Sequence, residues 1–155
     1  MCEFFSCIVK RDGEVIWDAS INSHDELIEK AGLKDETAEP DKLEFARVEI
    51  TCDDIFEKDL KKWKLKIDEA IEPTWWHAKH EIKAYEALKE CLDKHILDGV
   101  KIETLENIYI IAMRNSTVKN MWENSTVEYM RDNSIAIARE TKQIYCSNNF
   151  KIIKK

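Results

Sequence analysis

The sequence contains few of the residues from which phosphate cradles and flexible loops are built: only 3 of its 155 residues are glycine and 2 are proline. No Walker loop and no GxGxxG, GxSxG, HExxH or EF-hand pattern occurs. These absences argue against the common nucleotide-binding, hydrolase, metalloprotease and calcium-binding motifs. A nine-residue spacing described below is shared with calcium-binding β-rolls, but their Gly-Gly-x-Gly-x-Asp ligands are missing, so we expect no calcium.

Long hydrophobic runs are also missing. The apolar run Ile108–Met113 is far shorter than the roughly 18 residues that cross a bilayer. Met1-Cys2-Glu3 places an acidic residue where a secretory signal carries basic ones. The five cysteines are odd in number, widely scattered and without a CxxC pair, which is typical of unpaired thiols in a reducing compartment. We therefore expect a cytoplasmic protein without a membrane contact.

Charge is present in abundance but unevenly placed, within a total of −7. Residues 1–72 hold 20 acidic and 11 basic side chains, a balance of −9, whereas residues 73–155 hold 11 acidic and 13 basic ones, a balance of +2. An acidic surface repels nucleic-acid phosphate and attracts basic partners. We expect no direct contact with nucleic acid. Simple solubility is the alternative explanation of the charge.

The first half of the sequence has the pattern of an α+β domain. An Asp12-Gly13 turn joins two runs rich in β-forming residues, and Ser23 with Glu26 is typical of a helix start. Two later segments alternate between apolar and charged residues, as strands with one solvated face do. The predicted elements are a hairpin of Glu3–Val9 and Glu14–Trp17, a helix over His24–Ala31, a charged loop over 34–42, and strands at Phe45–Ile50 and Trp63–Ile67.

A long helix is predicted from the entrance at Glu72-Pro73-Thr74 to about Leu97, because this run lacks glycine and proline and is rich in helix formers. Asp98-Gly99 ends it. One stripe at helical spacing must pack on the sheet. It consists of His77, His80, Ala84, Leu88, Cys91 and His95. We therefore predict an α+β domain over residues 1–98, in which an antiparallel sheet is packed by one short and one long helix.

The remaining residues, 99–155, carry a repeat. Asn-Ser pairs stand nine residues apart, and the first two begin the longer pattern Asn-Ser-Thr-Val-x-x-Met; the pairs are Asn115-Ser116, Asn124-Ser125 and Asn133-Ser134. Such regularity predicts one structural unit stacked on the next. We expect each unit to be a short strand and a turn, two units to complete one coil, and Thr117 and Thr126 to align on one face. Val118, Met121, Val127 and Met130 are expected to point inward, and Phe150, Ile152 and Ile153 to cap the open end. The prediction is a short C-terminal β-solenoid-like stack.

Several segments together resemble a family of uncharacterised phage and prophage proteins with an N-terminal MCEF-type domain and C-terminal nine-residue Asn-(Ala/Ser)-Thr-Val-like repeats. The segments are Met1–Ser6, Asp12-Gly13 with Val15–Asp18, Ser23–Glu26, Arg47–Ile50 and the Asn-Ser-Thr-Val repeats. The resemblance spans nearly the whole chain and implies the cytosol of a host cell, but it brings no catalytic residue. The repeats depart from the family's pattern, with Arg114, Glu123 and Asp132 where its glycine would stand.

Candidate chemistry is sparse. His77 with His80, and Cys91 with His95, have the spacing of metal-ligand pairs on a helix face. Because His80 and Cys91 are about 16 Å apart along a helix, the pairs cannot share an ion, and we expect no metal and no cofactor. Cys7 could meet a histidine as a nucleophile, but it alternates with apolar neighbours and is expected to be buried.

Two further groups are candidates for binding. Two of the carboxylates of Asp53, Asp54, Glu57 and Asp59 could act as an acid–base pair, but the interleaved lysines favour a solvated loop. Trp75 and Trp76 are adjacent, and on a helix two neighbours project about 100° apart and cannot both face one core. One of them is therefore expected at a junction or exposed as an anchor for a partner.

From these residues we expect a phage-type accessory protein that acts by binding, more in keeping with an acidic inhibitor of a host defence or nucleic-acid-handling protein than with an enzyme. Its expected contacts are Trp75, Trp76, Asp53, Asp54 and Glu57. One alternative is a protein that binds or processes a small nucleotide-like ligand, with His77, His80 and Cys7 in its pocket. Another is a structural module that assembles into a homo-oligomer.

Overall fold

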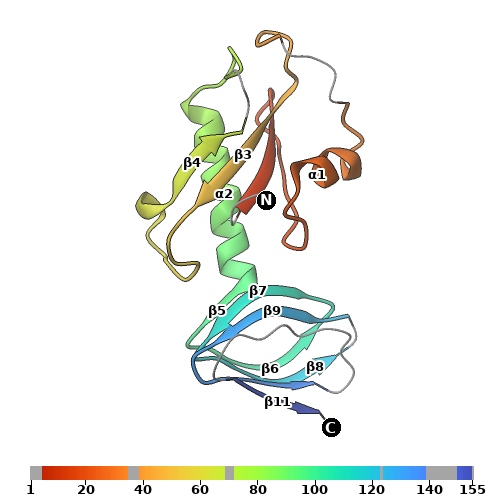
Figure 1. Ribbon diagram of the computed structural model, residues 1–155, viewed down its shortest axis with the longest axis vertical. Helices are drawn as coiled ribbons and strands as arrows, with labels where there is room; N and C mark the ends of the chain where they lie inside the picture. The colour runs from red at the N-terminus through yellow and green to blue at the C-terminus, as the bar shows by residue number, and fades with distance from the viewer. Residues whose placement is uncertain (1–4, 35–38, 69–71, 123, 139–149, 155) are drawn as a thin grey trace. The chain divides into compact units, whose positions relative to one another are not determined.

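The computed structural model describes residues 5–34, 39–68, 72–122, 124–138 and 150–154 (Figure 1). The chain divides into two compact units, Met1–Cys91 and Leu92–Lys155, whereas the sequence analysis placed its boundary after residue 98. In the described part of the chain, no helix is both long enough and apolar enough to cross a membrane.

The first unit contains a four-stranded antiparallel sheet in the order β2-β1-β3-β4. Its strands are β1 (Phe5–Lys10), β2 (Val15–Ile16), β3 (Phe45–Thr51) and β4 (Lys64–Ile67), and a 3₁₀ turn at Leu60–Lys62 precedes β4. Gly13 takes a φ of 94°, which allows the tight turn between β1 and β2. The predicted hairpin and both predicted strands are confirmed.

Helix α1 (His24–Lys30) begins where the sequence predicts. The Ser23 hydroxyl accepts a hydrogen bond from the backbone N–H of Glu26, and so caps the first turn. Leu27 and Ile28 are buried with Ile8 of β1 and Phe45 of β3 in one apolar cluster. The helix therefore covers the β1 side of this sheet face.

Helix α2 (Ala78–His95) begins later than predicted and ends earlier, since β5 follows it directly. A turn in which the N–H of Trp76 donates to the carbonyl of Pro73 at 3.0 Å comes first. The backbone N–H of His77 then donates to Nδ1 of His80 at 3.1 Å, a side-chain bond that satisfies an amide at the helix start. Trp75, Trp76 and His77 therefore precede the helix, and the expectation that they lie on it is wrong.

Four residues of the predicted stripe of α2 are nevertheless buried: His80, Ala84, Leu88 and Cys91. Ala87, which lies beside the stripe, is buried as well. Figure 1 shows that α2 passes behind the sheet of the first unit. His77 is exposed and His95 is half-buried, so the stripe is shorter than predicted at both ends.

The second unit contains two parallel sheets, ordered β5-β7-β9 and β11-β10-β8-β6, and the strands from β5 to β10 alternate between them. The strands are β5 (Ile96–Asp98), β6 (Lys101–Glu106), β7 (Tyr109–Arg114), β8 (Thr117–Trp122), β9 (Thr126–Arg131), β10 (Ser134–Ala138) and β11 (Phe150–Lys154). Each strand from β5 to β8 pairs with the next but one, as in the partnership of Thr117 with Ile135. Thr117 and Ile135 are two nine-residue units apart, the interval expected within the repeats. The partners that join β5 with β7, β6 with β8 and β7 with β9 are 16 or 17 residues apart.

The repeat also identifies the core of this unit. Val118, Met121, Val127 and Met130 are all completely buried, which confirms their predicted inward orientation. Thr117 and Thr126 lie on β8 and β9, which belong to different sheets, so they do not align on one sheet face. The strand β11 pairs in parallel with β10 and so covers that strand's edge. For residues 150–154 only the backbone is described, so the predicted capping by the side chains of Phe150, Ile152 and Ile153 stays a prediction.

The Asn-Ser pairs form the corners of the second unit. Asn115 and Asn133 have φ values of 48° and 52°, a left-handed conformation that asparagine tolerates better than most residues. The hydroxyl of Ser116 is buried, donates to the carbonyl of Arg114 at 2.8 Å and accepts from the N–H of Val100 at 3.2 Å. At these two corners asparagine adopts the left-handed conformation, and Ser116 satisfies backbone groups at the first of them. The buried hydroxyl of Ser125 has no hydrogen-bond partner among the described residues.

A pH-dependent contribution to stability is expected where α1 is tied to the segment after β2. Burial raises the pKa of Asp18, but hydrogen bonds from Lys30 and Ser20 outweigh that effect and lower the pKa to about 2. Because the folded-state pKa lies below the ordinary 3.8, the stabilisation is present above that value and is lost as pH falls through 2. Between pH 5 and pH 2, we expect the free energy of unfolding of wild type to fall by on the order of 1 kcal/mol relative to that of Asp18→Asn.

Urea unfolding at a series of pH values measures this difference. Lys30→Met should remove much of the pH dependence, because Lys30 donates to the Asp18 carboxylate. A difference between wild type and Asp18→Asn that is equal at pH 5 and pH 2 would contradict the prediction.

Candidate functional site

The two adjacent tryptophans have different environments. Trp75 is buried, and its indole Nε1 donates to the carbonyl oxygen of Leu43 at 2.5 Å. Its ring lies edge-on to the imidazole of His80, with 5.0 Å between centroids. Trp76 is half-buried and stacks on the same imidazole, with 5.5 Å between centroids. Trp75 therefore holds the segment before α2 in place, while Trp76 keeps a solvent-accessible part.

His80 is held by both of its ring nitrogens. Nε2 lies 3.2 Å from the carbonyl oxygen of Arg11, which can only accept, so Nε2 carries the hydrogen. Nδ1 accepts from the backbone N–H of His77. The ring is 1% exposed and has no lone pair left for a ligand, whereas the side chain of His77 is exposed. The two histidines therefore do not form a ligand pair.

Cys7 lies within β1, opposite Val48 of β3. It is completely buried, and burial raises the pKa of its thiol, which opposes formation of the reactive thiolate. A pocket of about 330 Å³ occurs elsewhere in the first unit, between the hairpin and α1, with Lys10, Trp17 and Lys30 in its wall. Cys7, His77 and His80 do not line it.

The acidic segment before β4, which contains Asp53, Asp54, Glu57 and Asp59, is an ordered loop. The carboxylate of Asp54 accepts from the backbone N–H of Phe56 at 3.1 Å, and that of Glu57 accepts from the N–H of Asp59 at 2.9 Å. Glu57 also pairs with Lys62 at 2.6 Å, and this hydrogen bond lowers the pKa of Glu57. Phe56 is buried beneath the loop, while Asp53 and Asp54 are exposed. These carboxylates fix the loop's own backbone.

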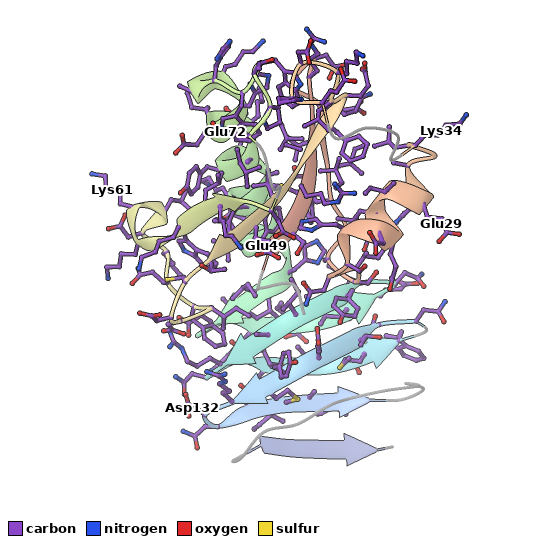
Figure 2. All side chains as sticks on the ribbon, turned by 45° about the horizontal axis from the view of Figure 1, so that its top comes forward. Glu29, Lys34, Glu49, Lys61, Glu72 and Asp132 are labelled. Carbon is purple, nitrogen blue, oxygen red and sulfur yellow. The ribbon has the colours of Figure 1, made fainter. Side chains whose placement is uncertain are left out.

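A different set of side chains forms the most unusual polar cluster among the described residues. His24 opens α1, Glu49 lies in β3, and Asp68 follows the last residue of β4. One potential ligand atom from each lies within 4.8 Å of the others. Figure 2 shows Glu49 over the central part of the first unit, while Glu29, Lys34 and Lys61 project outward.

The orientation of His24 is fixed by the sheet. Its imidazole is 4% exposed, and Nε2 lies 3.2 Å from the carbonyl oxygen of Val48, so Nε2 donates the hydrogen. Nδ1 consequently faces Oδ2 of Asp68, at 3.7 Å, a distance too long for a hydrogen bond. The Nδ1 side of the ring is thus directed toward a carboxylate.

Glu49 is the most deeply placed carboxylate of the cluster, with 7% of its surface exposed. The register of β3 places it between Ser6 of β1 and Lys66 of β4. The Ser6 hydroxyl is directed toward Asn22, and the Lys66 ammonium lies 3.8 Å from Asp68. Within the described part of the chain, the Glu49 carboxylate has no hydrogen-bond or ion-pair partner.

Sequence reasoning missed this cluster. The alternation in Phe45–Ile50 predicted that Glu49 faces solvent, but it is buried. The three residues stand in separate segments with no metal-ligand spacing, and His24 had a sufficient explanation as the first residue of a helix. The one available signal was the position of Glu49 in the middle of a predicted strand. That strand, β3, pairs with a neighbour on both of its edges.

Comparisons of the chain with protein families, with curated proteins and with solved structures found no match.

Proposed function

We propose that the protein acts by binding a basic protein partner, with the acidic surface of its first unit as the contact. The excess of nine negative charges in residues 1–72 supports this proposal, since complementary charge accelerates association and selects among partners. The buried Cys7 and the doubly bonded His80 give no support to catalysis at those residues.

The main support for the proposal is that hydrogen bonds fix the backbone of the acidic loop. Carboxylates of Asp54 and Glu57 accept backbone hydrogen bonds within the loop, and the indole of Trp63 donates to the carbonyl of Glu57 at 3.1 Å. The exposed carboxylate of Asp53 is therefore presented from a fixed backbone. A surface ordered before contact loses less conformational entropy on binding.

The resemblance to phage and prophage proteins suggests that the partner is a host protein in the cytoplasm. A host defence protein or a nucleic-acid-handling protein fits the charge, because the phosphate-binding grooves of such proteins are basic. The protein would then act as an acidic inhibitor that occupies such a groove.

We also infer that the second unit is a shortened β-solenoid that serves as a scaffold. Its support is the alternation of successive strands between two parallel sheets. The buried serines and left-handed asparagines of the repeats have structural roles at the corners, which leaves them unsuited to recognition.

The proposal is tested by charge reversal. A tagged chain is used to recover a partner from host lysate, and the affinity of that purified partner is then measured at several salt concentrations. We expect a basic protein whose affinity falls with salt, and falls at least about fivefold for Asp53→Lys. Glu106→Lys, an exposed site in the second unit, is the matched control and should bind as wild type does.

Equal loss in the two variants would contradict the assignment of the contact to the first unit. Recovery of nucleic acid in place of protein would contradict the proposed class of partner. A rise in melting temperature with a nucleotide would favour the small-ligand alternative, and a concentration-dependent oligomer in light scattering would favour self-assembly.

A further inference from the structure

We propose that His24, Glu49 and Asp68 form a binding site for one first-row divalent metal ion of the Zn²⁺ or Mn²⁺ type. The site lies wholly within the first unit and is independent of the binding function proposed above.

The first argument comes from the imidazole of His24. Histidines that bind metals commonly donate their other ring hydrogen to a backbone carbonyl or carboxylate, which fixes the tautomer and aims the lone pair at the ion. His24 has this arrangement, with Nε2 donating to Val48 and Nδ1 facing Asp68. Nδ1 and Oδ2 of Asp68 face each other at 3.7 Å, a gap that a cation could bridge.

The second argument comes from the Glu49 carboxylate. A buried ionised carboxylate is costly unless it is paired or coordinates a metal. The nearest cross-strand polar groups do not pair with it, because the Ser6 hydroxyl is directed to Asn22 and the Lys66 ammonium is beside Asp68. A divalent cation would pair with the Glu49 and Asp68 carboxylates at once, whereas the Lys66 ammonium lies beside Asp68 alone.

The third argument is geometric. Ligands of a zinc ion lie about 2.0–2.2 Å from it, so that donors on one ion are roughly 3 to 3.5 Å apart. The three donors already lie within 4.8 Å of one another. A contraction of at most about 1.3 to 1.8 Å, within the reach of side-chain rotation, would bring them to one ion.

Exposure differs among the three ligands in a way that suits an accessible site. His24 and Glu49 are buried, whereas the Asp68 side chain is 45% exposed. An ion could therefore enter beside Asp68 and retain a water molecule on that side. Three protein ligands with one open position are typical of zinc sites that act on a substrate.

The donor set also selects the metal. One imidazole nitrogen and two carboxylate oxygens suit zinc or manganese, whereas magnesium and calcium favour ligand sets made of oxygen alone. No thiolate is among the donors, so the soft ion Cu(I) is disfavoured.

The experiment uses the full chain, freed of metal with a chelator and titrated calorimetrically with ZnCl₂, MnCl₂, MgCl₂ and CaCl₂ separately. We expect one zinc or manganese ion per chain, at low micromolar affinity or tighter, and weaker binding of magnesium and calcium. Glu49→Gln and Asp68→Asn should each weaken zinc binding at least tenfold. Since Asp68 is half-exposed, Asp68→Asn provides a test even if the Glu49 variant does not fold.

Thermal unfolding supplies a second readout that a purely structural role would not produce. In metal-free protein, Glu49→Gln should raise the melting temperature, because it removes a largely buried carboxylate that has no ion-pair partner among the described residues. When zinc is added, the melting temperature of wild type should rise by mass action. The melting temperature of Glu49→Gln should rise much less. A carboxylate that merely stabilised the fold would show a loss in both conditions.

His77→Ala and Cys52→Ser are the matched controls, since each removes another potential zinc ligand that is at least partly accessible. Both should bind zinc as wild type does. The proposal is overturned if wild type binds no zinc or manganese, if Glu49→Gln and Asp68→Asn bind as wild type does, if a control loses the ion, or if magnesium or calcium binds more tightly.

Discussion

Replacement of Trp75 by alanine should remove a large part of the stability of the first unit. Truncation of a buried tryptophan typically costs about 3–5 kcal/mol, and loss of the indole hydrogen bond to Leu43 adds about 1 kcal/mol. Domains are commonly stable by only about 5–15 kcal/mol. The contact with His80 would be lost as well, so the start of α2 should loosen.

Trp76→Ala is the matched comparison, because it removes the same side chain from the next residue. Trp76 is half-buried and stacks on one face of His80, so we expect a loss of about 1 kcal/mol. Urea unfolding followed by far-ultraviolet circular dichroism measures both variants. If the proposed partner contacts Trp76, this variant should also weaken association. Equal losses of stability in the two variants would contradict the assigned roles.

The elements of the first unit that were predictable from the sequence are those with local causes. The Asp12-Gly13 turn sets the hairpin, and Ser23 caps α1 through a bond to a residue three positions away. The alternation in β3 and β4 is likewise local. Such patterns determine secondary structure because the interacting groups are neighbours in the chain.

The start of α2 was not predictable for the opposite reason. The indole of Trp75 is bonded to a residue 32 positions earlier, and the ring of His80 to one 69 positions earlier. These distant partners, together with the bond between His77 and His80, hold the segment before Ala78 out of the helix. Local helix propensity contains no information about them, and tertiary contacts override it.

The polar cluster shows the same limit for a site. The alternation of the strand predicts that Glu49 and Arg47 share a sheet face, but it does not predict which element covers that face. In the structure, α1 begins beside β3 and brings His24 to the carbonyl of Val48. The antiparallel register of β4 then places Asp68 beside them. A site built from three segments therefore emerges only with the topology.

The repeats of the second unit allowed more of the structure to be predicted, because a regular sequence period indicates which residues occupy equivalent packed positions. It identified Val118, Met121, Val127 and Met130 as inward residues, and all four are buried. It also gave the interval of two units between Thr117 and its partner Ile135. It did not reveal that Asn and Ser act at the corners, because the φ of Asn115 and the hydrogen bonds of Ser116 depend on the neighbouring strands.

Replacement of Met121 by alanine should have the largest effect in the second unit. Met121 is completely buried in β8, in the same apolar cluster as Leu105 and Val118. Truncation of a buried methionine costs about 2–5 kcal/mol, because lost contacts and a residual cavity add. Each strand buries its apolar face only against its neighbours, so the loss is expected to weaken several strands together.

Trp122→Ala tests the same strand one residue further on, where the side chain is 38% exposed. It removes more atoms than Met121→Ala does, yet it should cost less than about 1 kcal/mol, because surface substitutions leave no cavity. Urea unfolding measured by far-ultraviolet circular dichroism compares the two. If burial in the repeat core determines stability, the smaller truncation must have the larger effect; the reverse order would show that the second unit is held together by its outer surface.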